Sequence, residues 1–323
     1  MAPREERALV TGGAGFIGSH IVDALLESGY QVGILDDFSS GKRSNLPSGS
    51  QVVTHTGDVG DLAFVRRAIE GYKFVIHQAG RVSVTRSVED PLATNLANVG
   101  GTLNLLLASK DAGIERFVYA SSSSIYGETP TLPKTETMSP NPVSPYAVSK
   151  LAGEEYCRVF ASVYGLKTVS LRYFNVYGPR QVPGPYSGVI PTFMRDALKG
   201  ETPLIYGDGL QTRDFTFVGD VVQANLLCLS GDIKGGEVFN VASGKRVTIN
   251  ELAQTILALT GKQHLVPRHL EPRKGDVKHS LGDIGRITNA LGYSPKHDLQ
   301  SGLRQEIDWF RQQVGSNGSV DRV

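Results

Sequence analysis

The chain has 323 residues, enough for about two domains, and 40 % of them are hydrophobic and 20 % charged, as in an ordinary globular protein. Lys and Arg total 33 against 32 Asp and Glu, and this net charge of +1 argues against a nucleic-acid-binding protein. The sequence holds no apolar stretch of the roughly 20 residues that a membrane helix requires, and residues 1–7 lack the apolar region of a signal peptide. We therefore expect a cytoplasmic protein that binds neither nucleic acid nor a membrane.

Short apolar runs alternate with helix-like segments through the first half of the chain. The pattern predicts strands at residues 7–10, 31–35, 51–56, 74–77, 116–120 and 168–171. It predicts helices near residues 17–26, 62–69, 96–107 and 145–164, with a loop from 77 to 91. Strands that alternate with helices form right-handed crossovers, so we predict an α/β fold with a doubly wound parallel sheet of the Rossmann type.

The pattern changes near residue 175, where segments rich in Gly and Pro separate short helices. A predicted helix over 215–229 and a predicted strand over 237–241 return to the first sheet. We therefore predict one domain of residues 1–175, joined by about 214–242, and a second, smaller α/β domain of residues 176–323 that is interwoven with it. Cys157 and Cys228 are expected as reduced thiols, and the scattered histidines predict no metal site.

Three glycines, Gly12, Gly15 and Gly18, stand between the first predicted strand and the first predicted helix. Such a turn lets backbone N–H groups approach a pyrophosphate at a helix N-terminus, although a glycine turn without any ligand is the alternative. Asp36 follows Gly18 by 18 residues at the end of the second strand, where a carboxylate accepts hydrogen bonds from a ribose diol and repels a 2′-phosphate. These residues predict an NAD site rather than an NADP site.

Tyr146 and Lys150 stand four residues apart, so they share one face of the predicted helix over 145–164. A lysine ammonium and an oxidised nicotinamide both favour a phenolate, which lowers the pKa of a tyrosine toward that of a useful base. Residues 121–127, which we call the serine loop, follow a strand at the sheet edge where open α/β sheets bind ligands. By itself this loop would be an ordinary polar connection.

Further motifs accompany these features, namely LDD at 35–37, GDV at 57–59, HQAG at 77–80, RYFNVYGP at 172–179, RDF at 213–215 and RKGD at 273–276. In this combination the sequence resembles the extended short-chain dehydrogenases/reductases and, among them, the NAD-dependent UDP-sugar 4-epimerases. The likeness runs from residue 8 to about residue 312. It implies that the first domain binds NAD and that the second binds a UDP-sugar.

The resemblance implies a role for each matching position. Asp58 and Val59 would contact adenine, Asn98 would support the serine loop on the nicotinamide side, and Tyr173 would pack near the nicotinamide. Tyr146 would be the acid/base, and Lys150 would hold the nicotinamide ribose. The full NAD set is Gly12, Gly15, Phe16, Ile17, Gly18, Asp36, Asp58, Val59, Gln78, Ala79, Asn98, Tyr146, Lys150 and Tyr173.

A second set of residues would hold the substrate by the same resemblance. Ser122, followed by Ser123 and Ser124, would bond the sugar O4, and Tyr206 would pack on uracil. Asn175, Arg213 and Arg273 would grip the diphosphate, Asp276 would contact a ribose, and Ser280 would border the C2 substituent of the sugar. Val189 completes this set.

The reaction class follows from the same positions. A 4,6-dehydratase typically has an Asp-Glu pair where Ser123 and Ser124 stand, a decarboxylase commonly has Glu at 124, and UDP-glucuronate 4-epimerases usually have Thr at 175. A 4-epimerase of UDP-glucose and UDP-N-acetylglucosamine fits best. A non-catalytic NAD-binding scaffold and a dehydrogenase that releases NADH remain alternatives. We expect a homodimer formed through residues 96–107 and 146–164, as in relatives.

Overall fold

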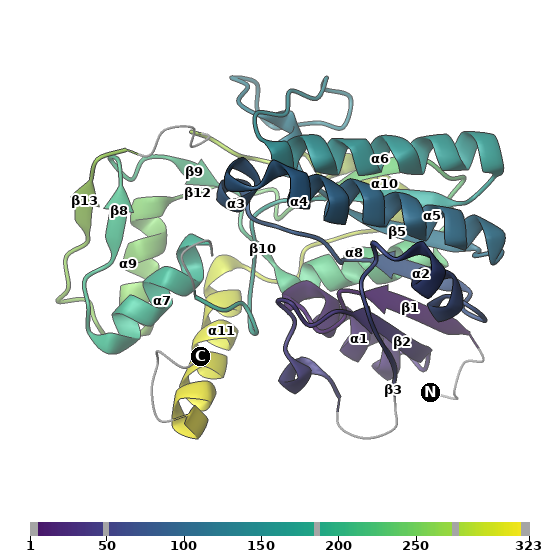
Figure 1. Cartoon of the computed structure of the whole chain (residues 1–323). Helices are drawn as coiled ribbons and strands as arrows, with labels where there is room; N and C mark the ends of the chain where they lie inside the picture. The colour runs from purple at the N-terminus through teal and green to yellow at the C-terminus, as the bar shows by residue number, and fades with distance from the viewer. Residues whose placement is uncertain (1–5, 48–51, 184–187, 273–277, 318–323) are drawn as a thin grey trace.

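The computed structural model describes residues 6–47, 52–183, 188–272 and 278–317. Its centre is a seven-stranded sheet in which all neighbouring strands are parallel, in the order β11-β6-β5-β4-β1-β2-β3 (Figure 1). The strands are β1 (Arg7–Thr11), β2 (Gln31–Asp36), β3 (Val52–Thr56), β4 (Phe74–His77), β5 (Arg116–Ser122), β6 (Thr168–Tyr173) and β11 (Glu237–Val241). The predicted doubly wound sheet is confirmed, and its order reverses between β1 and β4, which is where such sheets bind ligands.

Helices cover both faces of this sheet because its central strands are apolar on both sides. On one face, α1 (Phe16–Glu27), α8 (Val218–Ser230) and α10 (Gly285–Leu291) share one apolar core with the strands. On the other face, α2 (Leu62–Ala68), α5 (Gly101–Asp111) and α6 (Pro145–Tyr164) share another. Cys157 and Cys228 are buried in these cores as free thiols.

The segment from 77 to 111 differs from its prediction in two ways. The predicted loop contains α3 (Val84–Glu89), and the predicted helix begins earlier, with α4 (Pro91–Asn95), and runs on into α5. Between α4 and α5 lies a π-helical turn, Leu96–Gly100, and turns of this kind are frequent at functional sites. Asn98 is buried in that turn.

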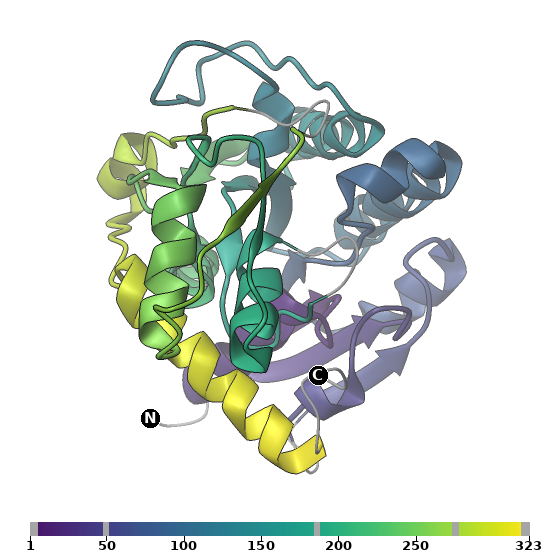
Figure 2. The ribbon, with the colours of Figure 1, turned by 90° about the vertical axis from the view of Figure 1, so that its left-hand side faces the viewer.

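Other segments of the second half of the chain form a separate layer beside the carboxyl edge of the sheet (Figure 2). It contains α7 (Val189–Lys199), α9 (Ile249–Leu259) and α11 (Leu299–Asn317), which pack around their own apolar core. Short strand pairs connect them: β7 (Val176–Tyr177) with β10 (Thr216–Phe217), β9 (Thr212–Arg213) with β12 (Val247–Thr248), and β8 (Leu204–Tyr206) with β13 (Arg268–Leu270). Within the described ranges, every helix is too short or too polar to cross a bilayer.

The chain returns from this layer to the sheet, as the sequence predicts. Strand β10 precedes α8, so the helix begins at Val218 rather than at 215, and β11 then pairs with β6 as the seventh strand. Two single turns, η1 (Arg43–Asn45) and η3 (Ser123–Tyr126), complete the elements. The second of them lies within the serine loop.

Candidate active site

The glycine turn lies between β1 and α1 and admits no larger side chains. Gly12 has a φ of +67°, and a Cβ there would lie 2.7 Å from the backbone nitrogen of Ala79. A Cβ on Gly18 would lie 2.1 Å from the carbonyl oxygen of Gly12. No side chain caps α1, whose first residues are Phe16 and Ile17, so its N-terminal N–H groups face the turn unblocked by a cap. This glycine cradle fits a pyrophosphate at the positive end of a helix.

Asp36 lies at the end of β2 beside this turn. Its carboxylate accepts hydrogen bonds from the backbone N–H of Ala14 at 2.9 Å and of Phe38 at 2.8 Å. Burial raises the pKa of Asp36, although those two hydrogen bonds act in the opposite direction. Each carboxylate oxygen retains a second lone pair, which is what a vicinal ribose diol needs.

The other predicted adenine-side and strand-end residues lie along the same edge. Asp58 is exposed and accepts a bond from the Gly60 N–H at 2.8 Å, whereas Val59 is buried. Gln78 and Ala79 follow β4, and their N–H groups donate to the carbonyl and the hydroxyl of Thr11 at the end of β1. The sheet therefore gathers these residues on both sides of the β1–β4 reversal.

Tyr146, Ser122 and Lys150 meet at the carboxyl end of β5. Ser122 is the last residue of β5, and its hydroxyl lies close enough to the side chain of Tyr146, near the start of α6, to lower the pKa of that phenol. The Nζ of Lys150, one turn along α6, donates to the carbonyl oxygen of Ala120 at 2.9 Å. A polar donor, a phenol and an amine thus converge on one point at the sheet edge.

Burial shifts the pKa values of both Tyr146 and Lys150. Burial raises the pKa of Tyr146, and the nearby hydroxyl of Ser122 offsets this only in part. Burial also lowers the pKa of Lys150 to about 8, because its ammonium is held against a backbone carbonyl instead of a carboxylate. The lower pKa that we expect for Tyr146 beside Lys150 and an oxidised nicotinamide stays a prediction for the NAD-bound protein.

The remaining serines lie directly beside Ser122. Ser122 Oγ accepts from the Ser124 N–H at 3.2 Å and so caps the η3 turn. The hydroxyl oxygen of Ser124 is buried and has no hydrogen-bond partner among the described residues. Ser123 is partly exposed in the same turn. The loop therefore presents hydroxyl groups where the predicted O4 contact requires them, and it presents no carboxylate.

Asn98 forms hydrogen bonds with two neighbouring segments. Its Nδ2 donates to the Arg81 carbonyl at 3.0 Å and to Ser149 Oγ at 2.9 Å, and its Oδ1 accepts from the Arg81 N–H. The π turn directs its side chain to the loop after β4 and to α6, so these hydrogen bonds go to Arg81 and Ser149, and its support of the serine loop and the nicotinamide side stays a prediction. Ser149 Oγ in turn donates to the Tyr146 carbonyl at 2.7 Å, and Asn98 thereby acts on the backbone of Tyr146.

Two residues of this neighbourhood were not identified from the sequence. Ser87, in α3, accepts the Tyr146 N–H at 3.0 Å and is fully buried. Asn225, in α8, donates to the hydroxyl of Tyr173 at 2.8 Å, and Gln78 Nε2 donates to the same hydroxyl at 2.9 Å. Burial raises the pKa of Tyr173, so this neutral phenol closes a hydrogen-bonded wall between β4, β6 and α8.

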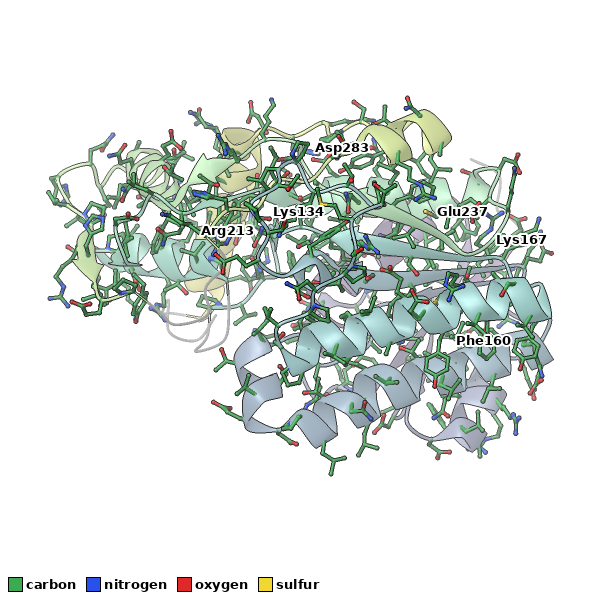
Figure 3. The ribbon with its side chains drawn as sticks, turned by 90° about the horizontal axis from the view of Figure 1, so that it is seen from above. Lys134, Phe160, Lys167, Arg213, Glu237 and Asp283 are labelled. Carbon is green, nitrogen blue, oxygen red and sulfur yellow. The ribbon has the colours of Figure 1, made fainter. Side chains whose placement is uncertain are left out.

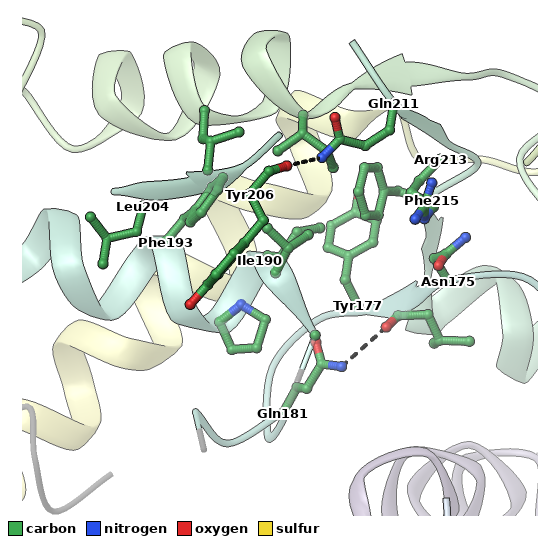
Figure 4. Close-up of a pocket in the computed structure, with 16 residues that line it drawn as sticks. Asn175, Tyr177, Gln181, Ile190, Phe193, Leu204, Tyr206, Gln211, Arg213 and Phe215 are labelled. Carbon is green, nitrogen blue, oxygen red and sulfur yellow. Dashed lines mark hydrogen bonds between the residues drawn. The ribbon is translucent and has the colours of Figure 1, made fainter. Parts of the chain in front are cut away.

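A cavity of about 270 Å³ opens in the second layer (Figure 4). Four predicted substrate residues line it: Asn175, Val189, Tyr206 and Arg213. Tyr206 is fixed through its carbonyl, which accepts from Gln211 Nε2 at 2.8 Å. Gln211 and Phe215 also line the cavity, and their alternation with Arg213 is the period-2 signal that could have identified them.

Three residues of the predicted substrate set remain: Ser280, Arg273 and Asp276. Ser280 is buried, and its N–H donates to the Thr212 carbonyl at 3.1 Å, so it lies beside β9 but outside the lining of this cavity. The carboxylate of Asp214, a residue that was not identified from the sequence, accepts hydrogen bonds from Ser243, Gly244 and Gly282. Arg273 and Asp276 lie outside the described residues.

A buried lysine connects the serine loop to the segment that carries Ser280. Lys134 Nζ donates to the Gly127 carbonyl at 2.7 Å. Its backbone N–H donates to the Leu281 carbonyl at 2.8 Å, and its own carbonyl accepts from the Asp283 N–H at 2.9 Å. Viewed from above, Lys134 lies between Arg213 and Asp283 (Figure 3). The catalytic-side loop and the substrate-side segment are therefore fixed to each other.

Comparisons with known proteins agree with this geometry. The sequence model of the NAD dependent epimerase/dehydratase family matches residues 8–242. A UDP-glucose 4-epimerase of Mycolicibacterium smegmatis is 40 % identical over 310 residues, covering 94 % of this chain and 98 % of that protein.

Two solved structures have the same fold over nearly the whole chain. One is a UDP-glucose 4-epimerase of Thermotoga maritima with UDP-glucose, with a TM-score of 0.92, 40 % identity and coverage of 95 % of this chain and 99 % of that one. The other is a UDP-N-acetylglucosamine 4-epimerase of Methanobrevibacter ruminantium with UDP-N-acetylmuramic acid. Its TM-score is 0.92, its identity 41 %, and the coverage is 97 % of this chain and 100 % of that one.

Proposed function

The chain belongs to the NAD dependent epimerase/dehydratase family, and we propose that within it this protein is a 4-epimerase of UDP-hexoses. The observation that carries the proposal is the hydroxyl pair of Ser122 and Tyr146 at the sheet edge, next to serines at 123 and 124. In this proposal Tyr146 is the base and Ser122 the O4 contact, whereas serines stand at 123 and 124 in place of the acids that a dehydration needs. The cavity beside Arg213 and Tyr206 supplies the place for the nucleotide.

The dinucleotide would be held by the glycine turn, Asp36 and Lys150. Bound there, NAD⁺ supplies the two-electron acceptor for C4 of the sugar and returns the same electrons, so that it is not consumed. Tyr146, as phenolate, takes the proton of the 4-hydroxyl and later returns it to O4. Ser122 is hydrogen-bonded to O4 in this proposal and so holds the sugar against Tyr146. Residues 1–175 with 214–242 form the dinucleotide-binding unit in this proposal.

Both plain and N-acetylated UDP-hexoses are proposed substrates. Ser280, assigned to the C2 side of the sugar, is small and buried beside the main chain of Thr212. A small residue leaves room for an acetamido group, and its hydroxyl offers that group a hydrogen bond. This support concerns substrate range only, and the epimerisation chemistry does not depend on it.

A homodimer completes the proposal. Leu92 and Leu96 are 68 % and 59 % exposed, and Val148 and Val163 of the adjoining α6 are 53 % and 64 % exposed. Exposed apolar side chains on neighbouring helices favour burial against a second copy. Replacing both leucines by Glu should convert a dimer to a monomer in size-exclusion chromatography with light scattering. An unchanged mass would contradict this interface.

The deciding experiment is NMR of the purified protein, without added cofactor, incubated separately with UDP-glucose, UDP-N-acetylglucosamine and UDP-glucuronate. We expect the galacto-configured product from the first two and none from the third. Turnover of UDP-glucuronate alone would replace the proposal by a glucuronate epimerase or decarboxylase. Bound NAD without any turnover would identify a scaffold, and dependence on added cofactor would identify a dehydrogenase.

A further inference from the structure

Helix α6 carries a third buried polar residue in line with Tyr146 and Lys150. Glu154 follows Lys150 by four residues, so the three side chains share one face of the helix. Glu154 is only 3 % exposed. A buried carboxylate requires partners, because an unpaired charge away from water is strongly unfavourable.

The partner of Glu154 is Arg172, which directly precedes Tyr173 in β6 and is 4 % exposed. The guanidinium binds the carboxylate through two bonds, from Nε to Oε2 at 3.1 Å and from Nη2 to Oε1 at 2.5 Å. Burial is the largest single influence and opposes the charge of Arg172, but Glu154 and Tyr126 together outweigh it and raise the pKa of Arg172. The two parallel bonds make the pair bidentate and fix its direction.

The same two residues hold both ends of the serine loop. Glu154 Oε2 accepts the hydroxyl of Ser121 at 2.8 Å, at the start of the loop. Arg172 Nη1 donates to the hydroxyl of Tyr126 at 2.8 Å, near its end, and Tyr126 donates to Asn240 Oδ1 at 2.7 Å. Ser122, whose hydroxyl is close to the side chain of Tyr146, lies between these two anchor points.

We propose that Glu154 and Arg172 are positioning residues that hold the serine loop so that the hydroxyl of Ser122 stays directed at the hydroxyl of Tyr146. A buried ion pair is weak evidence of a stabilising role, since an apolar pair of similar volume often stabilises a protein equally well. The hydrogen bonds of the pair instead hold Ser121 and Tyr126, which lie before and after Ser122 in the loop. The effect of this pair on turnover rests on the proposed function.

The test removes the pair without leaving a lone buried charge. The double variant Glu154→Met/Arg172→Met keeps apolar volume at both positions, and Ser121→Ala removes a single anchor if the double variant does not fold. The matched control is Glu155→Gln, because Glu155 is the next residue of α6 but is exposed and paired with Arg158. All variants are compared as purified holoenzymes for melting temperature, NAD content, kcat and KM.

We expect a kcat about 10-fold or more below wild type for the double variant, a smaller loss for Ser121→Ala, and no change for Glu155→Gln. KM should stay within about two-fold, because the nucleotide cavity is untouched. Displacement of the Ser122 hydroxyl raises the pKa of Tyr146, so the acid limb of the kcat–pH profile should move to higher pH and part of the activity should return there. A folded variant with unchanged kcat, or with a loss that is equal at every pH, would overturn the proposal.

A second measurement separates this proposal from the proposed function. The ultraviolet absorbance of the Tyr146 phenolate, taken as the difference between each variant and the same variant carrying Tyr146→Phe, reports its titration without any turnover. An upward shift in the double variant supports the loop assignment even if the wild type epimerises no UDP-hexose. An unchanged titration overturns it even if the wild type is active.

Discussion

Lys150 should stabilise the folded chain less than an apolar residue would in the absence of NAD. Its folded pKa of about 8 lies below its ordinary value of 10.5, and 2.5 pKa units correspond to about 3 kcal/mol against folding at neutral pH. Replacing it by Met also removes the bond to the Ala120 carbonyl, worth about 1 kcal/mol. We therefore expect Lys150→Met to raise the free energy of unfolding of the NAD-free protein by about 2 kcal/mol at neutral pH, while turnover is lost.

The pH dependence identifies the cause of this gain. The folded wild type binds fewer protons than the unfolded chain between pH 8 and 10.5, so its stability rises through that window and the advantage of the variant shrinks. Urea unfolding at neutral pH and at about pH 9.5 measures both values. Lys110→Met, at a partly exposed lysine of α5, controls for the substitution itself. A variant less stable than wild type at neutral pH, or an advantage that does not change with pH, would refute the reasoning.

Three further substitutions test the site. Tyr146→Phe should lower kcat by roughly 10²–10⁴ with NAD still bound, since only the acid/base is removed; near-normal turnover would exclude Tyr146 from that role. Asp36→Ala should reduce the NAD that denaturation releases and relax the bias against NADP, because a 2′-phosphate would no longer face a carboxylate; equal NAD content would contradict it. Ser280→Tyr should lose about 10-fold or more of UDP-N-acetylglucosamine turnover but keep that of UDP-glucose, because overpacking the C2 side costs about 1–3 kcal/mol; equal turnover of both substrates would place the determinant elsewhere.

The sheet could be predicted because its signals are local. Apolar runs separated by helical periodicity predict the strands, and a crossover of one hand leaves few possible orders. The glycine turn could also be predicted from the sequence, since Gly12 requires a positive φ and Gly18 a close backbone contact. Helix α3 could not be predicted, because Val84 and Val88 of this short helix are exposed and give the sequence no apolar helical face. Ser87, which lies in this helix, was therefore not identified either.

The buried pair of Glu154 and Arg172 could not be predicted from the sequence. The four-residue spacing of Tyr146, Lys150 and Glu154 is visible in the sequence, but a glutamate on a helix is usually solvated, so spacing alone does not predict its burial. Arg172 stands in a strand, 18 residues away, and only the register of β5 and β6 brings it to Ser121. The raised pKa of Tyr146 likewise depends on desolvation, which is a property of the packed fold.

The pairing of β11 with β6 has a consequence for the order in which this protein is made. Residues 174–236 separate the two strands, so the seventh strand cannot join the sheet until the ribosome has passed residue 241. Until then β6 is an open edge, and open edges pair readily with strands of other chains. Helix α8, which packs on this part of the sheet, also forms late, because it precedes β11 by only a few residues. The nascent chain is therefore most exposed to aggregation while its second layer is being synthesised.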